Sequence, residues 1–399
     1  MALTMKTPQE LITKTALRYR KADRGGKTRI LDDLVEWTQG DRSALARALR
    51  RTGPRGRWGG RRLRSGRKPT YGPEVLDPLL RVWRILHCPC GKRLAPHIEE
   101  MLDVLSRCGE LRVNPVTRAQ LARMSASTID RLLAPERKRM ELRGRSRTRS
   151  GGLLKSQIPL KTFADWDETS PGFVEVDLVS HDGGNTRDEF GYTLTLTDVA
   201  TGWTQCRVVR NRAREWTLQA LKKLRTRMPF PLLGLNSDNG SEFINHHLAH
   251  YCEQERITFT KSRPYRKNDN CLVEQKNNAV VRTWVGYVRF DTVHERGLMN
   301  RLYDLHRLWF NFFQPQMKLA SKLREGAKVR RRHDTARTPY RRTLDSSVLD
   351  SAGAAALETV YGTLNPAQLH RTMLELQRQL WQHAAAKERR RQADDSEAL

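Results

Sequence analysis

The stretch GLNSDNGSEF, residues 234–243, ends an apolar run with an acidic turn and decides how the middle of the chain is interpreted. Leu232, Leu233 and Leu235 are typical of a buried strand, and Asp238 stands where that strand ends. An Asp-Asn-Gly turn can serve the backbone alone, because these residues favour turn conformations. If Asp238 serves chemistry instead, other carboxylates must converge on the same edge of a sheet.

Strand and helix patterns surround this stretch in a definite order. The alternation and β-branched content predict strands at 173–179, 191–199, 202–209, 231–237 and 257–261, and the helical periodicity predicts helices at 215–228, 243–256 and 271–288. Three antiparallel-looking strands followed by alternating helices and strands predict a mixed five-stranded α/β sheet with helices on its faces. This is the element order of a ribonuclease-H-like core.

Two further acids fall at matching places in this order. Asp177 lies mid-strand in VEVDLV, where alternation puts it on one face with Glu175, and an ionised carboxylate there needs a cationic partner. Glu274 lies near the start of the last helix, with 35 residues between it and Asp238. The alternatives are a structural Asp177, a turn-forming Asp238, and Asp269 in place of Glu274; Glu175 is expected to be structural.

With these segments in place, residues 173–290 resemble the D,D(35)E catalytic core of retroviral integrases and bacterial insertion-sequence transposases. VEVDLV, SDNGSEF and RPYRKNDNCLVEQKNN carry the likeness, and DTARTPYRR downstream is most similar to the bacterial transposases. The resemblance implies that Asp177, Asp238 and Glu274 are catalytic and bind two Mg²⁺ ions, with Mn²⁺ as an alternative. Two ions about 3.5–4 Å apart would activate the nucleophile and stabilise the leaving oxygen.

The charge of the chain indicates its partner. Lys and Arg number 73 against 44 Asp and Glu, a net charge of +29, which favours a polyanion such as DNA. We find no apolar run of about 18 residues and therefore expect no membrane partner. The N-terminal MALTMKTPQELITK lacks the continuous apolar core of a signal peptide. We expect a bacterial cytoplasmic, nucleoid-associated protein.

Three basic stretches, 50–68, 137–150 and 322–342, contain many Lys and Arg and are expected to be arms that contact phosphates, with a solvated face as the alternative for each. Helix-turn-helix patterns at 27–51 and 116–133 are expected to read DNA, although any two-helix hairpin can imitate them. The candidate DNA-binding residues are Arg42, Arg61, Arg62, Arg64, Lys267, Lys276, Asn277 and Arg282. His181 either touches substrate or has no role.

Two short motifs raise other chemistries. The segment HCPC, residues 87–90, suggests a zinc site, but its Cys-x-Cys spacing and the missing second pair favour ordinary thiols among the six cysteines. The segment RGGKT, residues 24–28, lacks the first Gly of a phosphate-binding loop, so ATP use is not expected.

The C-terminal region has its own pattern. Leu369, Met373, Leu376 and Leu380 follow a 4-3-4 spacing, which fits either a short coiled coil that makes an oligomer or a helix packed on its own chain.

The fold expected is multidomain: helical helix-turn-helix domains, an α/β ribonuclease-H-like (integrase) core, and a basic C-terminal region that ends in a helix. The boundaries are 1–52 for the first helix-turn-helix domain, 53–70 for a basic arm, 71–136 for the second helical domain, 137–165 for a basic linker, 166–292 for the core, 293–345 for a helix with a DNA-contacting region, and 346–399 for the last helix.

The function expected is that of a Mg²⁺-dependent DDE transposase. It would bind the terminal inverted repeats of its element, cleave DNA and join 3′-hydroxyl ends to target DNA, as a homo-oligomer assembled on DNA. The alternatives are a sequence-specific regulator with an inactive core and a ribonuclease-H-like nuclease without strand transfer.

Overall fold

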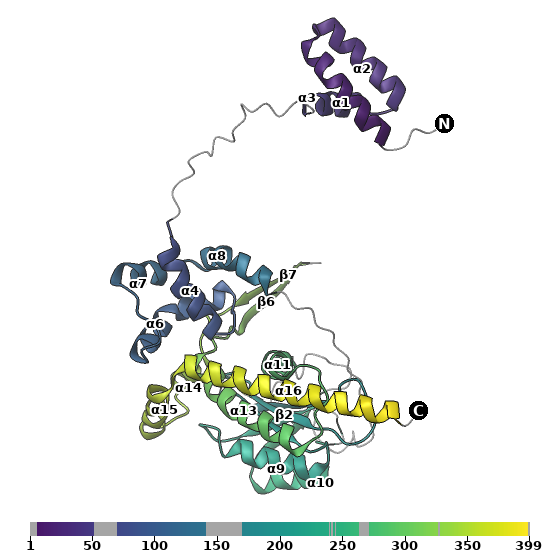
Figure 1. Cartoon of the computed structure of the whole chain (residues 1–399). Helices are drawn as coiled ribbons and strands as arrows, with labels where there is room; N and C mark the ends of the chain where they lie inside the picture. Colours follow the sequence, from purple (N-terminus) through teal and green to yellow (C-terminus); the bar gives the residue numbers. More distant parts are fainter. Residues whose placement is uncertain are drawn as a thin grey trace. The chain divides into compact units, whose positions relative to one another are not determined.

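The computed structural model describes residues 6–51, 70–140, 170–238, 240, 242–243, 245–262, 271–325 and 328–397 (Figure 1). The chain divides into two compact units, Met1–Thr70 and Tyr71–Leu399. None of the helices in the described part of the chain is long and apolar enough to cross a membrane.

The first unit is a three-helix cluster. Its helices are α1 (Lys6–Lys21), α2 (Arg24–Thr38) and α3 (Arg42–Arg51). Asp23 caps α2 by accepting the N–H of Gly26 at 2.9 Å, so the RGGKT segment is the start of a helix. Gln39 then ends α2 in the left-handed conformation (φ 53°). The helix, turn and helix predicted at 27–51 are therefore present as α2 and α3.

The second unit begins with a helical module, residues 71–140. It contains α4 (Pro73–Ile85), α5 (Gly91–Leu94), η1 (Ala95–His97), α6 (Ile98–Arg107), α7 (Pro115–Ala122) and α8 (Ala126–Arg139). The helix pair predicted at 116–133 is α7 and α8, with Ser125 as the N-cap of α8. A Cβ at Gly91 would lie 2.1 Å from the backbone oxygen of Ala126, so only glycine allows α5 to pack this closely on α8.

This module shares a hydrophobic core with the rest of the second unit. Leu79, Trp83 and Met101 are buried in the same cluster as Phe312 and Phe313. The indole of Trp309 also donates to the carbonyl of Ile85 at 3.0 Å. Residues 71–136, which the sequence suggested as a separate domain, are thus packed against the core region.

A mixed five-stranded sheet forms the centre of the second unit. Its strands are β1 (Phe173–Ser180), β2 (Tyr192–Asp198), β3 (Thr204–Val209), β4 (Gly234–Ser237) and β5 (Thr258–Lys261), in the order β3-β2-β1-β4-β5. Strands β1, β2 and β3 pair antiparallel, whereas β4 is parallel to both β1 and β5. The predicted mixed sheet is confirmed, and β1 and β4 are neighbours as expected.

Helices cover both faces of the sheet. On one face, α9 (Arg214–Arg225) and α10 (His246–Gln254) pack on the even-numbered side chains of β1, such as Val174 and Val176. On the other lie α11 (Cys271–Lys276), η2 (Asn277–Arg282), α12 (Thr283–Val285) and α13 (Val293–Phe313), against Val179. The single helix predicted at 271–288 is therefore interrupted by the π-helical turn η2 and ends at Gly286, whose φ is 71°.

The C-terminal region contains β6 (Leu319–Glu325), β7 (Lys328–His333), α14 (Pro339–Asp345), α15 (Ser351–Thr363) and α16 (Pro366–Glu397). Most of the third basic stretch, expected to be an arm, forms the β6–β7 hairpin because its strands pair antiparallel.

Helix α16 lies along α13 (Figure 1). Met373, Leu376 and Leu380 are buried in one cluster with the side chains of α13, and Leu369 packs against that cluster. The apolar stripe on α16 is thus occupied within its own chain, which is the second of the two alternatives.

A charged network fixes the far half of α16. Lys387 donates to Asp291 at 2.7 Å and to the buried Glu295 at 2.6 Å, and Arg391 pairs with Asp291 at 2.7 Å. Burial alone would raise the pKa of Asp291, but hydrogen bonds from Lys387, Arg289 and Arg391 outweigh it and hold that pKa well below its usual range.

Replacing Lys387 with Met is expected to lower the free energy of unfolding by about 3 kcal/mol, because the fully buried carboxylate of Glu295 loses its ammonium partner. Urea denaturation followed by circular dichroism measures the change. The matched control is Arg378→Met, which removes an exposed pair with Glu375 and a hydrogen bond to Gln382 and is expected to leave the free energy of unfolding close to that of wild type.

The penalty should also depend on pH with a defined sign. A carboxylate whose pKa is depressed by folding contributes stability above its unfolded pKa and loses it as the pH falls. The difference in the free energy of unfolding between wild type and Lys387→Met is therefore expected to become smaller below about pH 4. Identical urea midpoints for the two proteins at neutral pH would contradict the role of the network.

Candidate active site

Strand pairing brings Asp177 and Asp238 together. Strands β1 and β4 run parallel in a register that pairs Val176 with Ser237, and the next residue of each strand is an acid. Burial first, then the charge of Asp238 and, more weakly, that of Glu274 raise the pKa of Asp177 to about 7. Two of the three predicted acids therefore lie near each other, Asp177 in the middle of β1 and Asp238 directly after the neighbouring strand β4.

Asp177 is held by two hydrogen bonds. The backbone N–H of Leu178 donates to its Oδ1 at 2.8 Å, and the side-chain amide of Asn277 donates to its Oδ2. Asn277 belongs to η2, and its own Oδ1 is buried without a protein partner. The π-helical turn thus places an amide against the most strongly perturbed acid of the site, a position in which such turns are often found.

Asp238 combines a turn role with a place in the site. Its Oδ1 accepts the backbone N–H of Gly240 at 2.9 Å, which is the turn interaction considered as the structural alternative. Burial nevertheless raises its pKa, and its charge acts on Asp177. The two roles coexist, because one carboxylate oxygen is enough for the turn.

Glu175 orients the helix that carries Glu274. This carboxylate is buried and accepts the backbone N–H groups of Leu272 at 3.0 Å and Val273 at 3.1 Å. These donors lie in the first turn of α11, where backbone N–H groups have no partner within the helix. Sequence reasoning expected Glu175 to be structural but missed this contact. Its shared face with Asp177 was the available signal.

Glu274 is exposed on α11, and its charge contributes to the raised pKa of Asp177. Among the residues that the structure describes, no three His, Cys, Asp or Glu side chains are arranged closely enough to hold a metal ion together. The structure therefore brings Asp177 and Asp238 together and places Glu274 close enough for its charge to act on Asp177. Among the described residues, the three acids are not close enough to bind one metal ion together.

The Asp177 and Asp238 carboxylates fit a divalent cation. Magnesium is commonly held by one or two carboxylates, with waters and substrate phosphates completing its shell. Burial and then the charge of Asp238 raise the pKa of Asp177 to about 7, and a bound cation would favour the ionised carboxylate against both effects.

Several predicted DNA contacts have partners inside the protein. Arg282 donates to the carbonyl of Ser180 at 2.8 Å, and its guanidinium lies 4.6 Å from the ring centre of Tyr287. Lys276 bonds Gln316 and sits 4.9 Å from the ring centre of Phe310, and burial lowers its pKa to about 7.

Of the remaining candidate DNA-binding residues, two have partners inside the protein and four lie outside the described residues. Arg42 pairs with Asp32, and Asn277 is engaged with Asp177. Arg61, Arg62, Arg64 and Lys267 lie outside the described residues. DNA contact by any of the eight residues stays a prediction.

Two histidines pack against aromatic rings of the protein. His181 is fully buried, lies 2.7 Å from the hydroxyl of Thr193 and meets the ring of Phe290 edge-on, so it is not available to touch substrate. His87 of the HCPC segment stacks on Trp284 with ring centres 4.9 Å apart. Neither belongs to a metal-binding group among the described residues.

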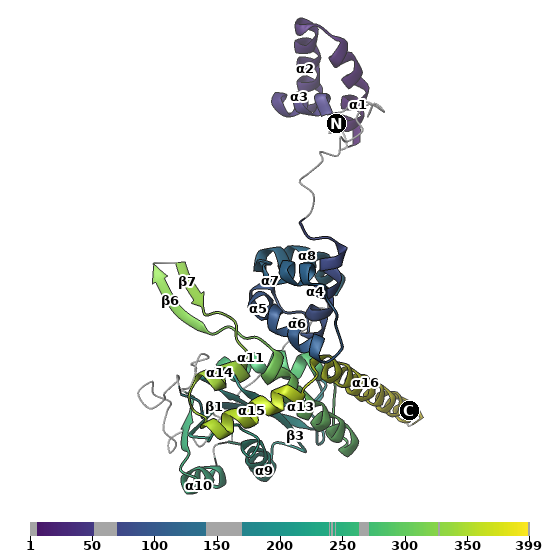
Figure 2. The same cartoon turned by 90° about the vertical axis from the view of Figure 1, so that its left-hand side faces the viewer.

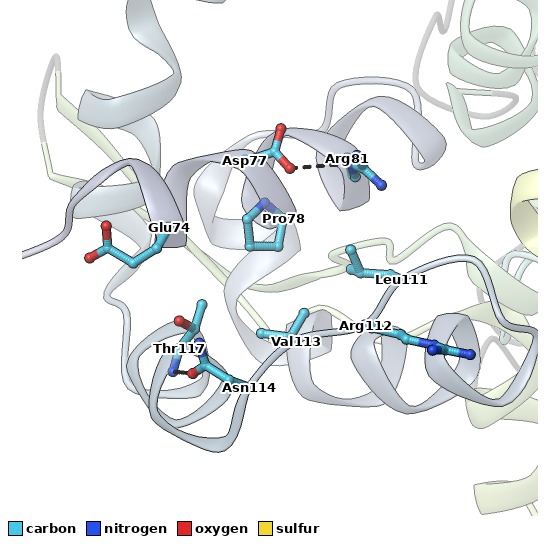
Figure 3. A pocket seen from close by; sticks show the side chains of 9 residues that line it. All are labelled: Glu74, Asp77, Pro78, Arg81, Leu111, Arg112, Val113, Asn114 and Thr117. Atoms are coloured by element: carbon cyan, nitrogen blue, oxygen red, sulfur yellow. Dashed lines mark hydrogen bonds and ion pairs between the residues drawn. The ribbon is translucent and has the colours of Figure 1, made fainter.

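A cavity of about 370 Å³ lies elsewhere, between α4 and the segment that leads into α7 (Figure 3). Acidic and basic side chains both line it, and Asp77 pairs with Arg81 at 3.3 Å. None of the three site acids lines this cavity, so it is not the candidate active site.

Comparison with known proteins adds the family. Residues 167–267 match the family model "Integrase core domain", a range that includes Asp177 and Asp238 and ends before Glu274. The chain is also 40% identical over 336 residues to "Uncharacterized protein y4rM" of Sinorhizobium fredii (strain NBRC 101917 / NGR234). The alignment covers 83% of this chain and 93% of that protein. The chain belongs to the y4rM family.

Solved integrase cores are more distant from this y4rM-family protein. The HTLV-2 integrase catalytic core domain in complex with magnesium is 13% identical, with a TM-score of 0.29, over 38% of this chain and 93% of that one. The catalytic core domain of BIV integrase is 18% identical, with a TM-score of 0.30, over 44% and 95%. The family-model match supports an integrase-like or transposase-like class, whose reaction is polynucleotidyl transfer.

Replacing Glu175 with Ala in this y4rM-family protein is expected to cost about 1–3 kcal/mol of stability, because the part-buried N–H of Leu272 and the buried N–H of Val273 lose their acceptor. Urea denaturation measures the loss. Glu253→Ala, at an exposed glutamate of α10, is the control and should stay within about 0.5 kcal/mol of wild type. Equal stability of the two variants would show that Glu175 does not hold α11.

Proposed function

We propose that this protein is a DDE transposase that binds the terminal inverted repeats of its element, cleaves DNA and joins 3′-hydroxyl ends to target DNA. The observation that carries the proposal is that Asp177, in the middle of β1, and Asp238, directly after β4, lie on neighbouring strands within an integrase core. Glu274 follows on a helix that Glu175 caps, so the third acid has a defined position relative to the other two.

In this proposal, Asp177, Asp238 and Glu274 hold the catalytic metal. Two Mg²⁺ ions, or Mn²⁺, would supply activation of the attacking oxygen and stabilisation of the leaving oxygen. The amide of Asn277 fixes the orientation of Asp177. Because the Oδ1 of Asn277 has no hydrogen-bond partner in the protein, it can also accept a hydrogen bond from a bound water.

The rest of the chain is proposed to handle DNA. The helix pairs α2–α3 and α7–α8 would read the terminal repeats, and the basic stretches would neutralise phosphates, in line with the net charge of +29. Reaction at two ends requires a homo-oligomer assembled on DNA. We place this activity in the bacterial cytoplasm, at the nucleoid.

One observation favours a second candidate, a sequence-specific DNA-binding regulator with an idle core. The acids of the described part of the chain do not form a closed metal-binding group. The pKa of Asp177, raised first by burial and then by the charges of Asp238 and Glu274, favours the enzyme, because strongly perturbed pKa values cluster at functional sites.

Changing Asp177 to Asn should abolish catalysis and leave binding to terminal DNA within a few fold of wild type, since the substitution removes charge and keeps shape. The assay incubates protein, Mg²⁺, a labelled terminal duplex and a plasmid. Joined product supports the transposase, cleavage alone supports a nuclease without strand transfer, and binding alone supports the regulator.

The matched control for this assay is Asp304→Asn. It removes the charge of an α13 acid that pairs with Arg227, and it should leave DNA binding and strand transfer near wild type. Simultaneous loss of binding and catalysis in Asp177→Asn would show that Asp177 is structural.

Replacing Arg61, Arg62 and Arg64 with Ser should weaken binding to every duplex. If all three contact phosphates, the slope of log K against log salt should fall by about 2.7 in magnitude. Titrations from low to high salt measure it, and the triple Lys variant, which keeps the charges, should retain the wild-type slope. An unchanged slope in the Ser variant would show that these three arginines do not contact DNA phosphates.

A further inference from the structure

The β6–β7 hairpin is a basic two-stranded ribbon that extends away from the helices and sheet of the second unit (Figure 2). Residues 319–333 contain six Lys or Arg and one Glu. The side chains of Leu323, Arg330, Arg331 and Arg332 are all exposed. Leu323 is 62% exposed, so the hairpin presents an apolar side chain together with its charges.

The strand register sorts these side chains onto two faces. Leu323 lies opposite Arg330, and Ser321 lies opposite Arg332. Residues directly opposite in an antiparallel pair share a face, and neighbours along a strand alternate. One face therefore carries Leu323, Ser321, Arg330 and Arg332, together with Glu325 near the tip, whereas Arg331 belongs to the other. We call the first the Leu323 face.

The base of the ribbon is fixed to the core. Backbone hydrogen bonds of 2.9 and 3.0 Å join Gln316 and Arg337, and Asp334 accepts the N–H of Lys318 at 2.7 Å. Lys318 also donates to the carbonyl of Ala200 at 2.9 Å. The side chain of Gln316 bonds Lys276 of α11, the helix of Glu274. The ribbon is thus anchored beside the candidate active site.

A ribbon of this composition suits a polyanionic partner. Two-stranded hairpins are marginally stable in water when neither face is covered. Three consecutive arginines repel one another, and the single acid within the ribbon, Glu325, pairs with Arg330 only at 3.7 Å. A partner that supplies negative charge along both edges and an apolar contact on one face would relieve both costs.

We propose that the β6–β7 ribbon enters the major groove of duplex DNA with its Leu323 face toward the base edges. The major groove admits a two-stranded β-ribbon, whereas the minor groove is about half as wide. Arginine and serine hydrogen-bond base edges, and an apolar side chain contacts the thymine methyl group, which lies in the major groove. Arg331, on the opposite face, would contact phosphate at most.

This inference rests on the proposed function, since it names the part of the DNA that the ribbon reads while the acids act nearby. The test uses the full-length protein and a duplex that the wild type selects from a random-sequence pool. Dimethyl sulfate distinguishes the grooves chemically, because it methylates guanine N7 in the major groove and adenine N3 in the minor groove. The strand-transfer assay is run on the same duplex.

Arg332→Ser and Leu323→Ser are compared with the matched control Arg331→Ser, which loses the same charge from the other face. The wild type should protect a cluster of guanine N7 positions. Arg332→Ser should lose that protection and bind the selected duplex about 5- to 100-fold more weakly. Leu323→Ser should relax the preference for thymine, and Arg331→Ser should keep the footprint. Unchanged circular dichroism would exclude misfolding.

Other outcomes overturn the proposal in distinguishable ways. Protection confined to adenine N3, loss of the footprint in Arg331→Ser with none in Arg332→Ser, or equal competition by duplex RNA would each overturn the groove assignment while strand transfer stands. If none of the three variants alters the footprint, the ribbon does not contact the DNA. Failure of the wild type to select any duplex would overturn the proposed function as well.

Discussion

The site depends on one pairing, the parallel alignment of β1 with β4. The two strands run in the same direction, and the register pairs Val176 with Ser237. The next residues are therefore Asp177, in the middle of β1, and Asp238, directly after β4. A one-residue slip would turn one acid to the opposite face. The buried apolar residues Val174, Val176 and Leu235, packed under α9 and α10, oppose that slip. Core packing on one side of the sheet thereby fixes the chemistry on the other.

The third acid depends on a different kind of interaction. Glu175 holds α11 through hydrogen bonds, because its carboxylate accepts two backbone N–H groups at the start of that helix. Asn277 then reaches back from η2 to Asp177, so the same short segment is attached to β1 at two points. Two polar contacts therefore link the sheet to the helix of Glu274.

The sequence predicted the sheet well because its signals are local. Alternating residues in VEVDLV and the acidic turn after PLLGLNS both depend on nearest neighbours. The hairpin was missed because KLREGAKVRRR lacks the apolar alternation of a half-buried strand. Its two strands are recognised only from their pairing in the folded protein. The capping by Glu175 and the burial of Lys276 and His181 were missed for a related reason. They depend on segments about 40 to 100 residues apart that meet only in the folded protein.

The attachment of the helical module to the core has a geometric consequence. The end of α4 is fixed by Trp309, which bonds the carbonyl of Ile85, and by Gln314, which bonds that of Leu86. Helices α7 and α8 thus stand at a set distance from Asp177 and cannot swing on a tether. If α8 reads a base sequence, the number of base pairs between that sequence and the cleaved bond is determined by the protein. Insertion of one base pair between them would rotate the bond about 34° around the duplex axis, out of reach of the acids.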